Sequence, residues 1–219
     1  NLAREVIRWA LTGRGVLGYG AGIVLGFVKT RPELATPDVQ FHLAHASYAD
    51  AATRKLEREP GMTLAVCPLR SESRGSIHVK SADPSVPPAI RGNFMSDPTD
   101  VAAIVAGMRI GRHIAEAAAL DPYRAYEMTP GPDCASDADF EAYARSTGQT
   151  LYHIVGTAKM GPATDGRAVV DDRLRVHGVP GLRVVDASIM PTLVSGNTNA
   201  AAIMIGEKGA AMLLEDARG

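Results

Sequence analysis

Residues 182–214 read LRVVDASIMPTLVSGNTNAAAIMIGEKGAAMLL, and this stretch decides the fold expected for the C-terminal part of the chain. The segment 182–186 is rich in Leu and Val and predicts a short buried strand that ends at Asp186. Residues 195–199 are turn and capping residues, and the almost uncharged stretch 200–214 after them predicts a helix. In α/β proteins ligands bind beyond the carboxyl ends of strands, so Asp186 is a candidate binding residue. An aspartate that caps the following turn is the simpler alternative.

The start of this predicted helix also suits a ligand. Unsatisfied N–H groups at a helix start, helped by the helix dipole, attract anions. The small residues Ala200, Ala201 and Ala202 leave room for a planar ligand or for another backbone. A buried helix with an ordinary N-cap is the alternative, and the segment taken alone favours it.

A histidine in an unusual setting lies upstream of this stretch. His153 stands in the segment YHIVGTAKMG (152–161), whose Gly156, Thr157 and Gly161 indicate a turn-rich loop. An imidazole is the side chain best suited to accept a proton near pH 7, so His153 is a candidate general base. A structural histidine is the alternative, and the other five histidines lack such a setting.

The first 150 residues combine strand-like and helix-like patterns. The pattern predicts strands over 23–28, 39–45, 62–69 and 76–80. The last two of these strands are expected to pair as a hairpin. The stretches that predict helices are 2–11, 98–120 and 136–145. Several strands interrupted by one long helix predict an α+β sheet domain.

Composition and charge exclude several classes of protein. The chain has 219 residues, 46% hydrophobic and 21% charged, which is typical of a folded globular protein and not of a disordered one. The net charge of −1 gives no sign of nucleic-acid binding, and no apolar run is long enough to span a membrane. Two cysteines are too few for a disulfide scaffold, and no Cys/His cluster has zinc spacing, so we expect no metal.

The N-terminal glycines do not predict a dinucleotide-binding loop. Residues 13–18 match G-x-G-x-x-G by letter, but they follow a predicted helix, whereas a phosphate loop follows a strand and opens a helix. No G-x-S-x-G segment is present for a hydrolase nucleophile. Because the sequence begins at Asn1 without a Met or a signal peptide, we expect it to be a piece of a longer polypeptide.

Three segments together resemble the C-terminal part of the glucose–methanol–choline (GMC) oxidoreductases, in the choline-dehydrogenase-like branch. They are HIVGTAKMG (153–161), DRLRVHGVPGLRVVDASIMP (172–191) and SGNTNAAAIMIGEKGA (195–210). Shorter matches extend the resemblance over most of the chain: Ser73-Arg-Gly75, Asn93-Phe94 and Ser96-Asp97-Pro98. Two departures remove no group that the chemistry needs: Ala158 where a Cys is frequent, and Ala201-Ala202 where Pro-Thr is frequent.

The resemblance implies a two-part architecture. Residues 1–160 would form an α+β substrate-binding domain with a mixed or antiparallel sheet and a long helix, and the leading segment 1–22 would lie at the domain junction. Residues 161–219 would form the C-terminal strand and helix of an FAD-binding α/β domain whose N-terminal part is absent from this sequence. We expect the apolar tail 184–214 to pack against the substrate domain or a second copy of the chain.

The resemblance also implies residue roles. His153 would take the hydroxyl proton of an alcohol, and Asn197 would hydrogen-bond the substrate oxygen. A hydride would pass from the alcohol carbon to the flavin of FAD. The residues expected to bind FAD in the intact protein are Asp186, Ala187, Thr198 and Asn199.

The expected partners follow from these roles. They are an alcohol substrate and the missing N-terminal FAD-binding segment, with a homo-oligomer allowed. We expect a cytoplasmic location, with peripheral membrane association left open, and no retention of FAD by this chain alone. Aromatic residues make up only 5% of the chain, which disfavours a cage for a quaternary ammonium group and favours a neutral primary alcohol over choline.

Two other functions stay open from the sequence. The main alternative is a flavin-free fragment or stand-alone binding module with no activity of its own. A metal-dependent hydrolase is a distant third.

Overall fold

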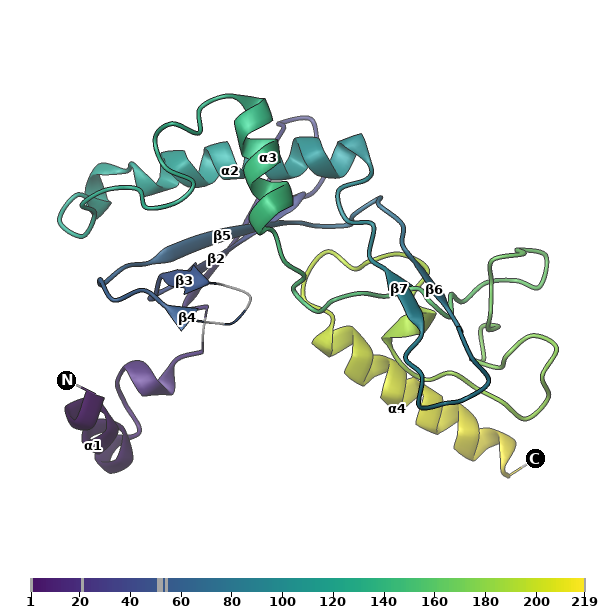
Figure 1. The fold of residues 1–219 in the computed structure, drawn as a ribbon. Helices are drawn as coiled ribbons and strands as arrows, with labels where there is room; N and C mark the ends of the chain where they lie inside the picture. Colours follow the sequence, from purple (N-terminus) through teal and green to yellow (C-terminus); the bar gives the residue numbers. More distant parts are fainter. Residues whose placement is uncertain (1, 21, 51–52, 54, 219) are drawn as a thin grey trace. The chain divides into compact units, whose positions relative to one another are not determined.

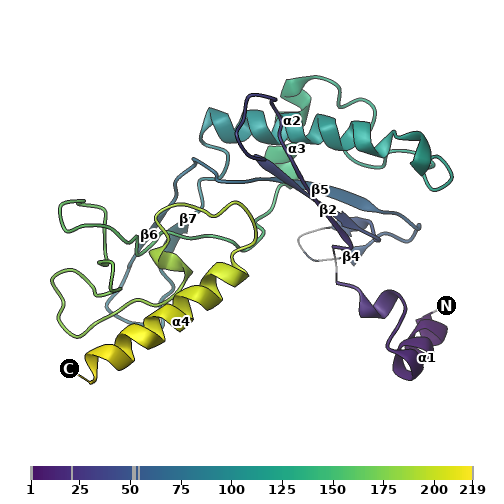
Figure 2. The ribbon, with the colours of Figure 1, turned by 180° about the vertical axis from the view of Figure 1, so that it is seen from behind.

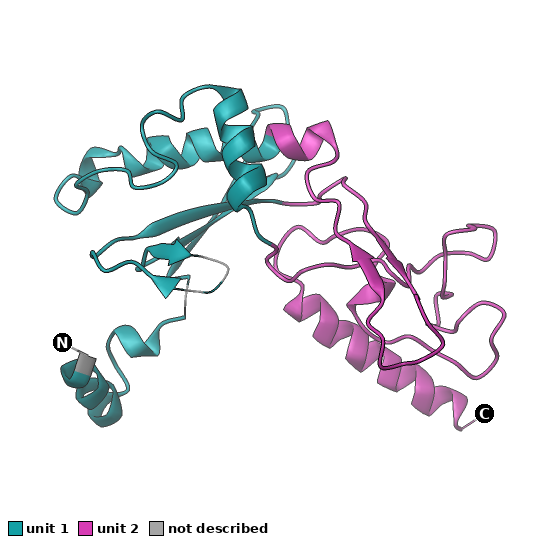
Figure 3. Ribbon diagram, in the orientation of Figure 1, with its two compact units in different colours: residues 1–68, 103–149 teal, residues 69–102, 150–219 magenta. Residues whose placement is uncertain are grey.

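The structure, a computed structural model, describes residues 2–20, 22–50, 53 and 55–218. It divides into two compact units, coloured separately in Figure 3. Unit 1 comprises residues 1–68 and 103–149, and unit 2 comprises residues 69–102 and 150–219. The domain boundary predicted at residue 160 refers to the intact protein and stays a prediction.

Unit 1 is built on a three-stranded antiparallel sheet, as Figure 1 shows. Its strands are β1 (Val24–Val28), β2 (Val39–Ala44) and β5 (Thr63–Pro68), in the order β1-β2-β5. The register places Phe41 opposite Gly26 on one side and Val66 on the other. The strands predicted at 23–28, 39–45 and 62–69 are therefore confirmed.

Helix α2 (Pro98–Ala115) covers one face of this sheet in both views (Figures 1 and 2). Two glycines allow the close approach: a Cβ at Gly107 would lie 2.7 Å from Val66 Cγ2, and one at Gly111 would lie 3.2 Å from Phe41 Cε1. The buried core of this contact is Val39, Phe41, Ile104 and Val105.

The helix predicted over 98–120 ends earlier, at Ala115. The Arg124 guanidinium donates to the Ala115 carbonyl over 2.7 Å and satisfies an acceptor that a longer helix would have used. A separate 3₁₀ turn, η2 (Ala118–Leu120), follows.

Two further helices of unit 1 agree with the sequence. Helix α3 (Asp137–Thr147) begins with a capping box between Ser136 and Asp139, and its Phe140 lies buried beside the guanidinium groups of Arg109 and Arg112. Helix α1 (Leu2–Thr12) ends at Gly13, whose φ of 63° suits a glycine at a helix C-terminus. The short elements η1 (Val16–Gly18), β3 (Tyr48–Asp50) and β4 (Lys55–Leu56) were not predicted.

The predicted hairpin between 62–69 and 76–80 is wrong. Strand β6 (Ser76–His78) pairs instead with β7 (Ala89–Arg91), which the sequence did not predict. Asp100 in the first turn of α2 accepts from the backbone N–H groups of Glu72 and Ser73, each over 2.9 Å, and so fixes the loop that leads to β6. Since a strand's partner is chosen by such distant contacts, local patterning could not identify it.

The core of unit 2 is a cluster of buried apolar side chains around helix α4 (Asn199–Asp216): Val170, Leu174, Ile189, Met190 and Ile205. The helix predicted over 200–214 is confirmed. A Cβ at Gly209 would lie 2.3 Å from Val185 Cγ1, so only a glycine lets α4 lie this close to residues 182–186. The exposed apolar side chains of α4 are Ile203, Met204, Leu213 and Leu214, and what covers them in the intact protein stays a prediction.

The strand predicted over 182–186 does not form. Only Arg183 makes an isolated bridge, to Arg175. Leu174, next to the bridge residue Arg175, has a φ of 66°, which lies in the left-handed region. The backbone beside Arg175 is therefore not extended there, and the bridge to Arg183 does not grow into a ladder. Asp186 instead begins a 3₁₀ turn, η3 (Ala187–Ile189).

Among the helices in the described ranges, none has the length and apolar character to cross a bilayer.

Candidate active site

The structure brings His153 together with two residues at the start of α4. Asn197 Nδ2 lies 2.8 Å from His153 Nε2, across a sequence separation of 44 positions. Thr198 Oγ1 lies 2.9 Å from the other ring nitrogen, Nδ1. The sequence paired His153 with Asn197, but it gave no sign that the Thr198 side chain would contact the same ring.

The loop that carries His153 is fastened to the core of unit 2. The N–H of Ala158 donates to the Ser188 carbonyl over 3.0 Å, and the N–H of Met160 donates to the Ile189 carbonyl over 2.8 Å. Gly156 has a φ of 89°, a conformation that favours glycine, and so turns the loop between His153 and these anchors. The ring is therefore positioned by the turn η3 that precedes α4 in the chain.

The orientation of the Asn197 amide indicates the tautomer of His153. An amide nitrogen has only protons to offer, so Asn197 Nδ2 donates and Nε2 of the ring accepts through its lone pair. The proton of the neutral ring is then on Nδ1, which donates to Thr198 Oγ1. Nε2 is then the nitrogen without a proton, and its single lone pair faces the Asn197 amide.

The two sides of the ring differ in exposure. Thr198 is buried, with 8% of its surface exposed, whereas Asn197 is exposed. His153 itself is half-buried. The Asn197 side of the ring is therefore the more exposed one, while the Nδ1 side is bounded by the buried Thr198.

The start of α4 lacks the ordinary side-chain cap that the sequence favoured. Thr198 occupies the N-cap position with φ −82° and ψ −9°, helical values where a capping residue is normally extended, and its side chain makes no capping bond. Such a bond typically stabilises a helix by about 1 kcal/mol. The hydroxyl contacts His153 instead, so the first-turn N–H groups of α4 receive no bond from the Thr198 side chain.

Asp186 caps the turn that follows it, which was the simpler of the two roles expected from the sequence. Its carboxylate accepts from the N–H of Ser188 over 2.7 Å and caps η3. A cofactor contact through the backbone of Asp186 or Ala187 is compatible with this role and stays a prediction.

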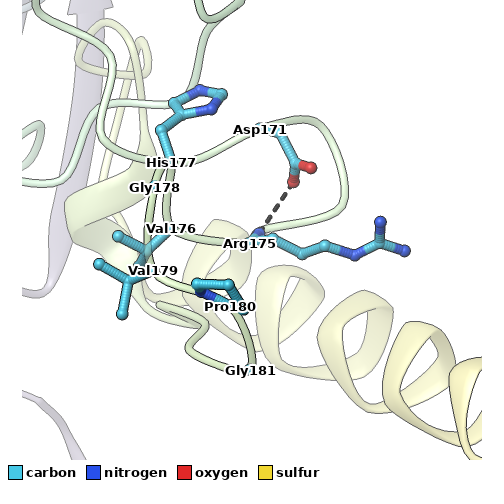
Figure 4. Close-up of a pocket in the computed structure, with 8 residues that line it drawn as sticks. All are labelled: Asp171, Arg175, Val176, His177, Gly178, Val179, Pro180 and Gly181. Atoms are coloured by element: carbon cyan, nitrogen blue, oxygen red, sulfur yellow. Dashed lines mark hydrogen bonds between the residues drawn. The ribbon is translucent and has the colours of Figure 1, made fainter.

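His177 lies in a different setting, at a hollow of about 310 Å³ shown in Figure 4. Its Nε2 is 3.0 Å from the carbonyl oxygen of Gly161. Asp171 at the same hollow accepts from the N–H groups of Arg173 and Arg175, the second bond being drawn in the figure. These polar groups hold the loop together and form no reactive set.

Cys67 and His42 form the one cysteine–histidine contact described in unit 1. The Sγ atom lies 3.8 Å from His42 Nε2 and 3.5 Å from the Gln40 carbonyl oxygen. Burial raises the pKa of the Cys67 thiol to about 11, against a smaller lowering effect of the Gln40 bond. The thiol is therefore protonated at neutral pH and unsuited to nucleophilic catalysis.

Within the described ranges, no group of three or more His, Cys, Asp or Glu side chains is placed to hold a metal ion. The metal-dependent hydrolase considered from the sequence thus gains no support from the geometry.

Comparison with known proteins gives consistent matches. The family model described as GMC oxidoreductase matches residues 71–206. The chain is 45% identical over 189 residues to an alcohol dehydrogenase [acceptor] of Pseudomonas putida, covering 86% of this chain and 34% of that protein. It is 43% identical over 201 residues to an oxygen-dependent choline dehydrogenase of Ectopseudomonas mendocina, covering 92% of this chain and 35% of that protein.

Solved structures match as well. Pyridoxine 4-oxidase from Mesorbium loti superimposes with a TM-score of 0.79 at 24% identity, covering 87% of this chain and 37% of that one, which supports the fold alone. A fungal aryl-alcohol oxidase gives 0.69 at 30% identity, covering 84% of this chain and 28% of that one. The chain spans about a third of the length of the curated relatives it matches.

Proposed function

Since this chain belongs to the GMC oxidoreductase family, we propose that it is the C-terminal part of an FAD-dependent enzyme that oxidises an alcohol. His153 is the base of this reaction and Asn197 is its hydrogen-bonding partner. The observation that carries the proposal is the 2.8 Å contact between Asn197 Nδ2 and His153 Nε2, which sets a proton acceptor and a proton donor side by side.

This pair suits the oxidation of an alcohol. The alcohol hydroxyl takes the place of the direct contact between the two side chains. Nε2 then accepts the hydroxyl proton, while the Asn197 amide donates to the oxygen as negative charge develops. The hydrogen on the carbon leaves with both electrons of its bond as a hydride, and the alcohol becomes an aldehyde. FAD, when bound, supplies the acceptor for that hydride.

The start of α4 fits the polar edge of such a cofactor. The Thr198 hydroxyl does not cap its N–H groups, because it is directed to His153. Asn199 and the small residues Ala200–Ala202 in the first turn leave space for a planar ring. Backbone groups of Asp186 and Ala187 would serve the phosphates or ribitol, and the remaining part of the FAD site comes from the rest of the protein.

The reaction class is supported by the names of the relatives. An alcohol dehydrogenase, choline dehydrogenases and an aryl-alcohol oxidase all act on a CH–OH group. For this protein we favour a neutral primary alcohol, because the low aromatic content argues against a cage for a quaternary ammonium ion.

The test uses the intact, FAD-loaded protein that contains this chain. The enzyme is mixed without oxygen with a primary aliphatic alcohol, with choline, or with the corresponding aldehyde, and the visible absorbance of the flavin is followed. We expect the primary alcohol to bleach the flavin faster than choline and the aldehyde to leave it unchanged. If neither alcohol bleaches a correctly loaded enzyme, the proposed function is wrong.

A further inference from the structure

We propose that Thr198 is the positioning residue that fixes the tautomer of His153 and thereby makes Nε2 its basic nitrogen. The proposal rests on the proposed function, because it assigns Thr198 a role through the base of that reaction. Thr198 was expected only to bind the cofactor, so its side-chain role is separate from that expectation.

The Thr198 hydroxyl contacts His153 and does not cap its own helix. A threonine at a helix start normally turns its oxygen to the N–H groups of its own helix. Here the backbone is helical at Thr198, no capping bond forms, and Oγ1 lies 2.9 Å from His153 Nδ1. The backbone of Thr198 is itself held in α4, since its carbonyl accepts from the N–H of Ala202 over 2.9 Å.

The chemistry of imidazole explains why a residue is needed that selects one tautomer. A neutral ring carries its proton on either nitrogen, and only the tautomer with Nδ1–H has a lone pair at Nε2. Nε2 is the nitrogen beside the exposed Asn197 amide, so it is the one that a substrate hydroxyl can reach. A buried acceptor for Nδ1–H selects this tautomer and also fixes the ring plane.

Two substitutions separate this role from simple packing. Thr198→Val has nearly the shape of threonine but offers Nδ1–H no acceptor, whereas Thr198→Ser keeps the hydroxyl and loses a methyl group. In the intact, FAD-loaded protein we expect Thr198→Val to lower the limiting rate of flavin reduction by the alcohol roughly 10- to 100-fold, as for other partners that orient a functional histidine. The alcohol concentration at half-saturation changes little, and Thr198→Ser restores most of the rate.

A spectroscopic measurement tests the tautomer without turnover. The protein is labelled with [¹⁵N]histidine, and the His153 ring signals are identified by their loss in His153→Gln. We expect a protonated Nδ1 and an unprotonated Nε2 in the wild type and in Thr198→Ser, and a mixture of tautomers in Thr198→Val.

The outcomes distinguish this proposal from the proposed function. If His153→Gln is slow but Thr198→Val has the wild-type rate and ring signals, the base assignment stands and the role of Thr198 is overturned. A proton on Nε2 in the wild type also overturns it. If His153→Gln reduces its flavin as fast as the wild type, the proposed function itself fails.

Discussion

Asn197 Nδ2 lies 2.8 Å from Nε2 of His153, although 44 positions of sequence separate the two residues. The contact exists because the His153 loop is fastened to η3 while Ile189 of that turn packs in the same core as Ile205 of α4. Since the amide donates, Nε2 carries no proton, and its lone pair becomes available to a substrate that displaces the amide. A proton acceptor and a hydrogen-bond donor thus share one site.

Replacement of His153 by Gln tests the base. We expect His153→Gln to lower the rate of alcohol oxidation by the intact enzyme roughly 10²- to 10⁴-fold, the usual contribution of a general base. The measurement is the limiting rate of flavin reduction, with FAD content checked by absorbance. The matched control is His177→Gln, whose ring Nε2 lies 3.0 Å from the Gly161 carbonyl oxygen and which should keep a nearly wild-type rate. Equal losses in the two variants would contradict the assignment.

Replacement of Asn197 tests the donor to the substrate oxygen. We expect Asn197→Ala to lower the limiting rate roughly 10²- to 10³-fold, because the donor stabilises charge that is present mainly in the transition state. The alcohol concentration at half-saturation should change much less than the limiting rate. A variant that binds alcohol poorly but reduces its flavin at the wild-type rate would show that Asn197 serves binding instead.

The isolated 219-residue chain should be colourless. The start of α4 provides only a few backbone N–H groups for FAD, and the expected binding residues include none for the adenosine of the cofactor. After incubation with FAD and removal of the excess, we expect no flavin bands in the visible spectrum. Stoichiometric flavin absorption would refute this expectation and with it the flavin-free alternative for the chain.

Two glycines of α4 give a matched pair for packing. A Cβ at Gly209 would lie 2.3 Å from Val185 Cγ1, whereas one at Gly206 would meet no atom within 4 Å. We expect Gly209→Ala to lower the free energy of unfolding by about 1–3 kcal/mol through overpacking. Gly206→Ala should instead raise it by up to about 1 kcal/mol, because alanine favours a helix. Chemical denaturation measures both, and equal effects would show that α4 does not lie this close to Val185.

The reactivity of Cys67 should depend steeply on pH. Its pKa is raised to about 11, so at pH 8 roughly one thiol in a thousand is ionised. Because the thiolate is the reactive form, alkylation by iodoacetamide should be slow at pH 8 and accelerate as the pH rises toward 11. Peptide mass spectrometry reads the label at Cys67 itself, and denatured protein at pH 8 is the control that should react quickly. Fast labelling of the folded protein at pH 8 would mean that the thiol is not buried as described.

Much of the local structure could be predicted from the sequence. The helices ending near Thr12, beginning at Asp137 and beginning at Asn199 were expected, because caps, glycines and apolar spacing are local signals. The strands at β1, β2 and β5 were expected for the same reason. Partner choice was not: β6 pairs with β7 because Asp100 holds the loop at Glu72 and Ser73.

The candidate site shows the same division. The resemblance of residues 153–161 and 195–210 already pointed to His153 and Asn197 as a pair, because both residues stand in recognisable local motifs. Only the folded chain shows that Thr198 contacts the same ring and that Nε2 is the nitrogen facing the Asn197 amide. A tautomer depends on which donors and acceptors meet the ring in space, and residues far apart in the chain bring those partners together only when the core of unit 2 has formed.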